Sequence, residues 1–509
     1  MIGINTRTRV SDIISEQDIH SWSQNSNISI SSATDTGKSF FIKNKLYDYC
    51  NLHNKKMIYI VSRRALKNQF LDEIISDGKD NRITISTYQK LEYKYRQNKL
   101  DNYLDEFDYI ILDEYHYFLN DSSFNRYTVF SLDAILCANS VRIWISATGE
   151  KMRKFLQENR NIVFREYHIE DSPKKMKISV FKNERELDEI LDIGITNGFK
   201  MILFTTDLHQ GVKFYERYRR YAIFNCSESN YTFNKYVDKK EIRYIEKNER
   251  FEKNILITST ALDCGLNIRD SEVRDIIIHG IHDIDTIVQC VGRKRFSNDN
   301  DSLTIHIPEI NNCQIGGYIC SAVRNMARAD YMMKHGEMQM IQDAFTHPRK
   351  YSKCENVVFD SEIGNRKIIN ELSYFYYSEL KLEYEQMVSN SKTNGFRNMI
   401  MQRLGITEYE EFDMGNHKAL EIYLNSLAIN DCDKSKKANN SKILLTKEAK
   451  DEFIERINLL HKDDYFKDVS VINTAFASFN LPYRVENFIT SRRENGKKTS
   501  FRAWRIVKI

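Results

Sequence analysis

The sequence is poor in proline and has no long apolar run. Only 4 of its 509 residues are proline. Its longest apolar stretches, such as 57–61 and 276–281, are far shorter than the roughly 20 residues of a membrane-spanning helix. The segment 1–17 lacks the charged-then-apolar order of a signal peptide. We therefore expect neither a membrane segment nor export.

Cysteine is present without any of the spacings that give it a structural role. The nine cysteines are odd in number and scattered, and none forms a C-x-x-C pair. This pattern argues against a disulfide framework and against a zinc site. A reducing, cytoplasmic location fits best.

The chain also lacks a strong overall charge. Its net charge is +4, with 29% charged and 41% hydrophobic residues, which describes an ordinary soluble globular protein. A nucleic-acid-binding surface would therefore have to be local. The length of 509 residues predicts three or four domains.

Short apolar runs separated by helix-length segments fill the chain up to about residue 310. Such runs are typical of buried strands in a parallel α/β sheet. The pattern pauses around 170–177 and then restarts, which predicts two domains, 1–170 and 171–310. The expected strands are 28–33, 56–62, 82–87, 107–114, 141–147, 177–182, 200–206, 254–260, 273–280 and 302–308.

The remainder of the chain has a different pattern. Helical spacing at 318–345 and 366–388 predicts a helical accessory domain over 311–429. A polar stretch, 430–442, is typical of a linker. A small module is expected over 445–509, with helices at 446–462 and 470–479 and a hairpin at 486–509 that turns at Asn495-Gly496.

Residues 31–40 read SSATDTGKSF and have the parts of a phosphate-binding loop. A strand precedes them, a turn follows, Lys38 is placed to bind terminal phosphates, and Ser39 offers a hydroxyl to Mg²⁺. Asp35 is unexpected, because it places a carboxylate where a polyphosphate would lie. A surface loop is the alternative interpretation. The loop residues expected to bind phosphate are Thr34, Thr36, Gly37, Lys38 and Ser39.

Two adjacent acids end the apolar run YIILDEYH at 109–116. Ligands bind at the carboxyl ends of the strands in α/β sheets. Asp113 is therefore expected to hold Mg²⁺, and Glu114 to polarise an attacking water. The alternative is a solvated strand end.

Seven short segments occur in an order that resembles the motifs of superfamily 2 helicases of the D-E-x-H type. They span about 30–310 and read SATDTGKS, VSRRALKNQF, ISTYQKL, DEYH, ISATG, ILITSTALDCGLNI and IVQCVGRKRF. The resemblance implies two tandem RecA-like domains, followed here by the helical region and a small C-terminal winged-helix-like module. It also implies ATP and Mg²⁺ as cofactors and nucleic acid as the partner.

The resemblance assigns roles to individual residues. Lys38, Ser39, Asp113 and Glu114 match the phosphate, metal and water-activating positions, and His116 would sense the γ-phosphate side. Ser146 and Thr148 match the motif that links the ATP state to domain closure. The second-domain matches are Gly265 of motif V, Gln289 and Arg293, which reach the γ-phosphate, and Arg295, a candidate arginine finger.

Two positions depart from the family pattern. Asp35 replaces a glycine. If its carboxylate lay about 6 Å from a phosphate, at an effective dielectric of 20, the repulsion would cost roughly 3 kcal/mol of binding free energy. The cost would be under 1 kcal/mol if the side chain were turned to water. We expect a solvent-facing Asp35 and a weakened ATP affinity. Phe296 stands where a second arginine is usual and Arg295 precedes it, a form similar to that of some viral origin-binding helicases.

Basic and hydroxyl side chains in the motifs are candidates for contacts with phosphate and sugar. The last 29 residues carry eight basic and two acidic side chains, and helices followed by a basic hairpin resemble a winged helix. A merely solvated hairpin is the alternative. The expected nucleic-acid contacts are Arg63, Arg64, Thr87, Thr205, Arg492, Arg493, Lys497 and Lys498.

The sequence thus predicts an ATP-dependent nucleic-acid helicase or translocase, with DNA favoured over RNA. An RNA helicase is the nearest alternative. A hydrolysis-poor scaffold that clamps nucleic acid is the alternative from a different class, and Asp35 is the residue that would indicate it.

Overall fold

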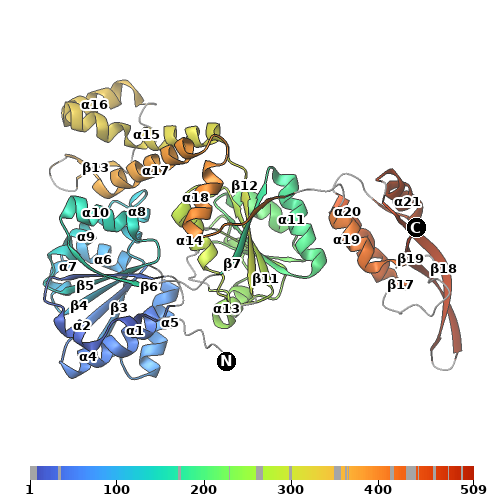
Figure 1. The fold of residues 1–509 in the computed structure, drawn as a ribbon, viewed down its shortest axis with the longest axis horizontal. Helices are drawn as coiled ribbons and strands as arrows, with labels where there is room; N and C mark the ends of the chain where they lie inside the picture. Colours follow the sequence, from blue (N-terminus) through green and yellow to red (C-terminus); the bar gives the residue numbers. More distant parts are fainter. Residues whose placement is uncertain are drawn as a thin grey trace.

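The structure, a computed structural model, consists of two α/β domains, a helical region and a C-terminal module (Figure 1). The described residues are 9–32, 36–62, 64–169, 174–227, 230–259, 267–296, 301–348, 357–361, 364, 366–412, 418–430, 443–444, 446–461, 466–479, 481–494 and 497–509.

The first domain is built on a six-stranded sheet whose strands are all parallel, in the order β3-β2-β4-β5-β1-β6. Every residue of β2 is buried, because helices cover both faces of the sheet. The strands are β1 (Asn27–Ser32), β2 (Met57–Val61), β3 (Ile83–Thr87), β4 (Tyr109–Asp113), β5 (Val141–Ser146) and β6 (Phe164–Ile169).

Alternate residues of these strands supply two separate cores. Tyr59 belongs to the core shared with the first six helical segments, whereas Ile58 and Ile60 belong to the core on the opposite face. The helical segments on the first face are α1 (Val10–Ile13), α2 (Glu16–Ser21), α3 (Lys38–Phe41), the π-helical η1 (Ile42–Leu46), α4 (Tyr47–Leu52) and α5 (Arg64–Ser76). Those on the second are α6 (Tyr88–Arg96), α7 (Leu100–Leu104), α8 (Tyr117–Ser122), α9 (Thr128–Cys137) and α10 (Glu150–Arg160).

The second domain has a seven-stranded sheet in the order β15-β7-β12-β11-β8-β10-β9, again parallel throughout. Its strands are β7 (Lys175–Phe181), β8 (Lys200–Thr205), β9 (Ala222–Asn225), β10 (Ile255–Ser259), β11 (Val273–His279), β12 (Ser302–Pro308) and β15 (Tyr409–Glu411). Its helices are α11 (Glu184–Asn197), α12 (Leu208–Arg217), the short 3-10 turn η2 (Asn234–Tyr236), α13 (Lys239–Asn248) and α14 (Ile284–Gly292).

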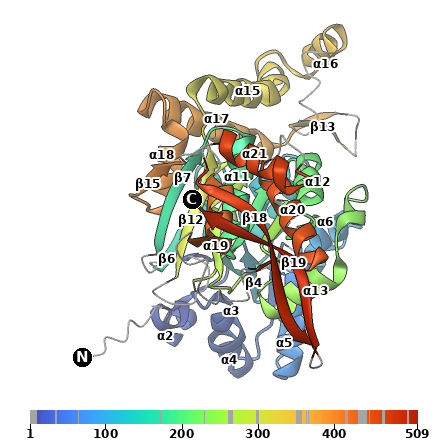
Figure 2. The same cartoon turned by 90° about the vertical axis from the view of Figure 1, so that its right-hand side faces the viewer.

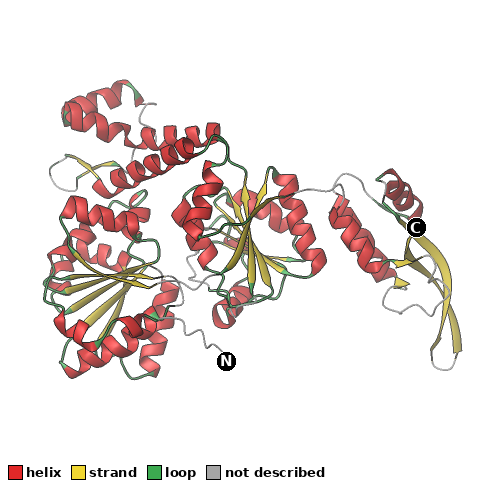
Figure 3. Ribbon diagram, viewed as in Figure 1, coloured by secondary structure: helices red, strands yellow, loops and turns green. Residues whose placement is uncertain are grey.

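The helical region lies across both α/β domains (Figures 1 and 3). Leu372 of α17 joins a core of the first domain, whereas Leu380 and Tyr384 of the same helix join a core of the second. The elements are α15 (Asn312–His335), α16 (Glu337–Thr346), the antiparallel pair β13 (Val358–Asp360) and β14 (Lys367–Ile369), α17 (Glu371–Asn390) and α18 (Gly395–Leu404). The chain then returns to the second domain, where β15 pairs with β7.

The C-terminal module has its own core and a long hairpin that projects from it (Figure 2). It rests on α11 of the second domain, where Arg456 Nη2 donates to Thr196 Oγ1 at 2.8 Å and the Ala419 amide donates to Glu189 at 2.7 Å. The elements are α19 (Lys418–Leu427), β16 (Ile429–Asn430), β17 (Ile443–Leu444), α20 (Lys447–His461), α21 (Val469–Ser478), β18 (Tyr483–Glu494) and β19 (Lys497–Lys508).

The predicted α/β class is confirmed: two tandem parallel-sheet domains are followed by a helical region. Among the described residues, no helix combines the length and apolar composition needed to cross a bilayer.

Candidate active site

The functional residues of the first domain come together where its strands end. Gly37 has the left-handed φ of +79°, which glycine adopts without strain, and the helical segment begins at Lys38 directly after it. Asp113 is the last residue of β4. Glu114 follows with φ of +52°, an uncommon conformation for a residue with a side chain. The chain thus turns sharply at the two acids and presents both at one edge of the sheet.

Tyr59 brings together the two residues expected to hold Mg²⁺. Its hydroxyl donates to Asp113 Oδ2 at 2.7 Å and also meets the side chain of Ser39. Tyr88 donates to the carbonyl of Asp113 at 3.0 Å and holds the same turn from the other face of the sheet. Asp113 and Ser39 therefore converge on one point, with β2 and the start of α6 supporting them.

The pKa values of the two acids are shifted in opposite directions. Burial, together with the neighbouring Glu114, raises the pKa of Asp113 to about 6. Burial also acts to raise the pKa of Glu114, but the positive charges of Lys38 and Arg293, the neighbouring His116 and the hydrogen bond from Ser146 outweigh it and lower that pKa below its usual value. Glu114 is therefore ionised at neutral pH, as a group that accepts a proton from water must be.

A chain of hydrogen bonds runs from the second domain to Glu114. Gln289 Nε2 donates to His116 Nε2 at 3.1 Å and to Thr148 Oγ1 at 3.0 Å. With His116 protonated on Nδ1, that nitrogen donates to Ser146 Oγ at 2.8 Å. Ser146 in turn donates to Glu114 Oε2 at 3.3 Å. Burial lowers the pKa of His116, so the neutral ring required by this chain is the form present at pH 7.

Arg293 lies beside the same carboxylate. Its charge acts on the pKa of both Glu114 and His116. The Nε of Arg293 is buried and has no hydrogen-bond partner among the described residues. A buried guanidinium nitrogen without a partner could donate a hydrogen bond to an anion such as a phosphate.

This arrangement fits Mg²⁺ and a nucleotide triphosphate. Ser39 and Asp113 offer oxygen ligands at one point, and Mg²⁺ prefers oxygen. Lys38 and Arg293 would hold the phosphates from the two domains. When bound, Mg²⁺ would neutralise phosphate charge.

Four other predicted residues are buried or hydrogen-bonded within their own domain. The Arg295 Nη2 donates to Asn267 Oδ1 at 2.7 Å, which joins motifs V and VI within the second domain. Thr36 is buried. Thr87 is buried and its side chain caps α6, accepting from the Lys90 amide at 3.2 Å. Thr205 is fully buried and lies 3.0 Å from His279 Nδ1.

Several predicted residues lie outside the described part of the chain. They include Thr34, Asp35, Arg63 and Gly265. The expectation that Asp35 faces solvent and weakens ATP binding therefore stays a prediction. Five more lie in described helices or strands, but their side chains are not described: Arg64, Arg492, Arg493, Lys497 and Lys498.

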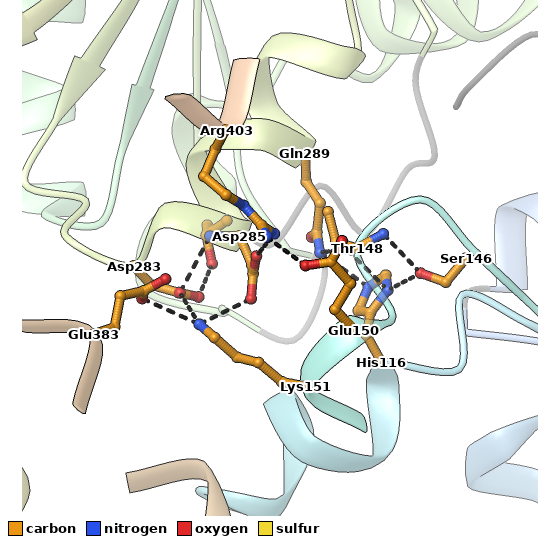
Figure 4. A network of polar contacts seen from close by, with 11 residues as sticks. His116, Ser146, Thr148, Glu150, Lys151, Asp283, Asp285, Gln289, Glu383 and Arg403 are labelled. Atoms are coloured by element: carbon orange, nitrogen blue, oxygen red, sulfur yellow. Dashed lines mark hydrogen bonds and ion pairs between the residues drawn. The ribbon is translucent and has the colours of Figure 1, made fainter. Parts of the chain in front are cut away.

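Sequence reasoning missed the polar groups that join the domains beside this site. They are Glu150 and Lys151 at the start of α10, Asp283 and Asp285 at the start of α14, Glu383 of α17 and Arg403 of α18 (Figure 4). The only available signal was position: Glu150 and Lys151 follow the ISATG segment directly, and Asp283 and Asp285 precede the QCVGR segment by a few residues. No pattern connects either pair with Glu383 or Arg403.

Part of the first domain matches a known family. Residues 7–151 match the family model described as type III restriction enzyme, res subunit. No curated protein matches the chain.

Solved structures with a similar fold are distant. S. cerevisiae Dbp5 bound to RNA and ADP BeF3 is 16% identical with a TM-score of 0.42, and the alignment covers 55% of this chain and 78% of that one. The Mycobacterium smegmatis helicase Lhr bound to ssDNA and AMP-PNP is 14% identical with a TM-score of 0.41, covering 58% and 45%. The DUF1998 helicase MrfA bound to DNA is 14% identical with a TM-score of 0.43, covering 71% and 60%. The residues that match this family model, 7–151, include the segments from SATDTGKS to ISATG that resemble the motifs of superfamily 2 helicases.

Proposed function

We propose that this protein is an ATP-dependent nucleic-acid helicase or translocase of the DExH type that acts on DNA. The observation that carries the proposal is the contact between Gln289 of the second domain and His116 of the first, at 3.1 Å. This contact joins the residues expected to bind and hydrolyse ATP across the domain boundary. A motor that couples hydrolysis to domain movement needs such a site.

The chemistry divides between the two domains. Lys38 binds the terminal phosphates, Ser39 and Asp113 hold Mg²⁺, and the ionised Glu114 accepts the proton of the attacking water. From the second domain, Arg293 stabilises the negative charge that develops on the γ-phosphate. Arg295 is a second candidate for that role, although its bond to Asn267 favours a structural part in the described geometry. Opening and closing of the site then moves the two domains relative to each other along a bound strand.

The choice of DNA rests on the C-terminal hairpin. The strands β18 and β19 pair over 12 residues each and project from the module that rests on the second domain. Four of the basic residues flank its turn, at 492, 493, 497 and 498. Phosphate contacts of this kind bind a duplex without reading its sequence. A DNA duplex beside the motor domains is the substrate that this placement favours.

The test is the ATPase rate of the purified protein alone, with single-stranded DNA, with duplex DNA and with RNA, together with Lys38→Ala and Asp35→Gly. We expect hydrolysis that DNA stimulates and that Lys38→Ala reduces by roughly 100-fold or more. Lys43→Met is the matched control, because Lys43 lies in η1, which follows α3 directly, and pairs with Glu73.

Each other outcome has a defined meaning. Stimulation by RNA alone would replace the DNA assignment with an RNA helicase. Absence of hydrolysis with either polymer, in a protein that still binds nucleic acid, would overturn the motor and leave a scaffold. A higher rate in Asp35→Gly would show that the aspartate restrains the phosphate loop.

A further inference from the structure

A cluster of charged side chains, largely buried except for the exposed Glu150, joins three parts of the chain close to the active site (Figure 4). Lys151 of α10 lies at its centre. The Nζ of Lys151 is 2.9 Å from Asp285 Oδ2, 3.1 Å from Glu383 Oε2 and 3.8 Å from Asp283 Oδ1. The first domain supplies the lysine, the second supplies both aspartates, and the helical region supplies the glutamate.

Arg403 of α18 makes the second set of contacts in the cluster. It binds Glu150 Oε2 at 2.6 Å through Nη1, and Asp285 Oδ1 through Nη2. The two oxygens of Asp285 are therefore bound by two cations, one from the first domain and one from the helical region. The two α/β domains contact each other directly through Lys151 and Asp285, and the helical region adds Glu383 and Arg403 to this contact.

The cluster contains more acids than bases. Four carboxylates face two cations, and three of the carboxylates surround Lys151. Lys151 has a side chain that is 18% exposed, and those of Asp285 and Glu383 are 7% and 12% exposed. Removing one partner from a buried set of charges costs more than the pair contributes, because the charges left behind lose their compensation. Without Lys151, three carboxylates would repel one another across the domain boundary.

The same helices that carry the cluster also carry the active-site contacts. The nine residues of α14 begin beside Asp283 and Asp285, include Gln289, and end immediately before Arg293. Helix α10 begins at Glu150, two residues after Thr148, which accepts from Gln289. A helix of this length is a rigid rod. Fixing its start therefore fixes the position of Gln289 and Arg293 relative to His116 and Glu114.

We propose that Lys151 and Arg403 are positioning residues, and that the helical region, through Glu383 and Arg403, acts as a clamp that sets α14 in register with the first-domain active site. The proposal rests on the proposed ATPase function. It gives the helical region a regulatory role: whatever moves α17 and α18 away from α14, such as nucleic acid bound against the helical region, would release the second-domain residues from the active site. ATP turnover would thus respond to the state of that region.

The first experiment uses Lys151→Met in the full chain, with Lys151→Arg as the conservative variant. We expect Lys151→Met to lower kcat by roughly tenfold or more and to leave KM for ATP within about threefold, because Lys151 orients the reacting groups without touching them. Lys151→Arg should restore most of the activity. Amide hydrogen exchange of α14 should be faster in Lys151→Met than in the parent protein, whether or not ATP is present.

Lys154→Met is the matched control. Lys154 lies one turn further along α10 and pairs with Glu379 of α17 at 2.7 Å, but its side chain is 43% exposed and it does not contact α14 in the described structure. Its loss should change neither kcat nor the exchange of α14. The double variant Lys151→Met with Glu383→Gln should recover part of the lost activity, because one of the uncompensated carboxylates is gone.

Unchanged kcat and unchanged α14 exchange in Lys151→Met would overturn the clamp. So would an equal loss in Lys154→Met, since that would indicate general destabilisation. If Lys151→Met fails to fold, Arg403→Met and Arg403→Lys take its place with the same readouts. Absence of ATPase in the parent protein would refute the proposed function, whereas the exchange of α14 would still decide whether the clamp exists.

Discussion

Gln289 Nε2 lies 3.1 Å from Nε2 of His116, although the two residues are 173 positions apart and belong to different domains. The contact makes the tautomer of His116 depend on the second domain. With Gln289 donating to Nε2, the imidazole proton resides on Nδ1 and is directed at Ser146, which in turn donates to Glu114. The carboxylate of Glu114, which we propose activates the attacking water, is thus connected to a side chain of the other domain by hydrogen bonds alone.

Replacing Gln289 should slow hydrolysis without weakening nucleotide binding. We expect Gln289→Ala to lower kcat by roughly 10- to 100-fold, because the loss of an orienting contact misplaces groups that do not themselves bind the nucleotide. Steady-state ATPase rates and equilibrium binding of a fluorescent ATP analogue separate the two effects. Gln210→Ala on α12 is the control. A parallel loss of binding and rate in Gln289→Ala would mean that Gln289 only maintains the fold.

The stability of the metal-free protein should depend on the ionisation of Asp113. The fold raises the pKa of this residue from 3.8 to about 6, so between these values the folded protein holds the proton more tightly than the unfolded chain. The stability contributed by the protonated form is complete below pH 3.8 and is lost as the pH rises through about 6. Above that pH, the buried charge of Asp113 destabilises the first domain.

Asp113→Asn removes this charge and keeps an oxygen for Tyr59. In EDTA at pH 7.5 the variant should be more stable than the parent protein by about 1–3 kcal/mol. The difference should shrink towards zero between pH 6 and pH 4. Denaturant unfolding followed at four pH values measures it. An advantage that is the same at every pH would show that a cause other than ionisation is responsible.

Much of the fold was predictable from the sequence because its signals are local. The apolar runs at 57–61 and 109–113 form β2 and β4 as expected, since strands covered on both faces must be apolar throughout. Motif order likewise indicated that Asp113 and Glu114 would share an edge with Lys38. The same local reasoning identified the two longest helices of the helical region, α15 and α17.

The contacts between domains were not predictable in this way. Glu383 and Arg403 come from helices with no motif, and their partners Lys151 and Asp285 look like ordinary surface charges in the sequence. Their pairing depends on how α17 and α18 pack on the second domain, which is set by side chains such as Tyr384 in a shared core. Thr87 shows the converse: the motif suggested a nucleic-acid contact, whereas local geometry places its hydroxyl as the cap of α6.

Gly149 has a packing role that makes its substitution costly. A Cβ at this position would lie 2.4 Å from the hydroxyl oxygen of Tyr115. Tyr115 is 3% exposed, and its hydroxyl donates to the Gly149 carbonyl at 3.1 Å. Since φ is −84°, alanine is not strained by the backbone, and the steric overlap alone destabilises the variant. We expect Gly149→Ala to lower the free energy of unfolding of the first domain by about 1–3 kcal/mol.

Gly316→Ala is the matched control for this substitution. Gly316 lies within α15 and a Cβ there would meet nothing within 4 Å, so alanine should stabilise the helix by about 0.5–1 kcal/mol. Thermal unfolding of both variants compares the two effects. If Gly149→Ala were as stable as the parent protein, Tyr115 would have to move freely, and the start of α10 would not be fixed by it.

The basic turn of the C-terminal hairpin should control the salt dependence of DNA binding. Changing Arg492, Arg493, Lys497 and Lys498 together to glutamine removes four positive charges at the end of β18 and the start of β19. Each phosphate contact that is lost reduces the number of counterions released when DNA binds. The slope of log affinity against log salt concentration should therefore become shallower by roughly 2–3. Fluorescence anisotropy with a labelled duplex at several salt concentrations measures this slope.

Arg484→Gln provides the control within the same hairpin. Arg484 and Arg505 both pair with Glu486 near the base of the hairpin, so the charge of Arg484 is partly compensated. Its loss should leave the slope within about 0.5 of the parent value, since a paired arginine releases few counterions. An equal change of slope in both variants would indicate that binding depends on the overall charge of the module. An unchanged slope in the fourfold variant would remove the hairpin from the DNA-binding surface, and the preference for DNA would then have to come from the two α/β domains themselves.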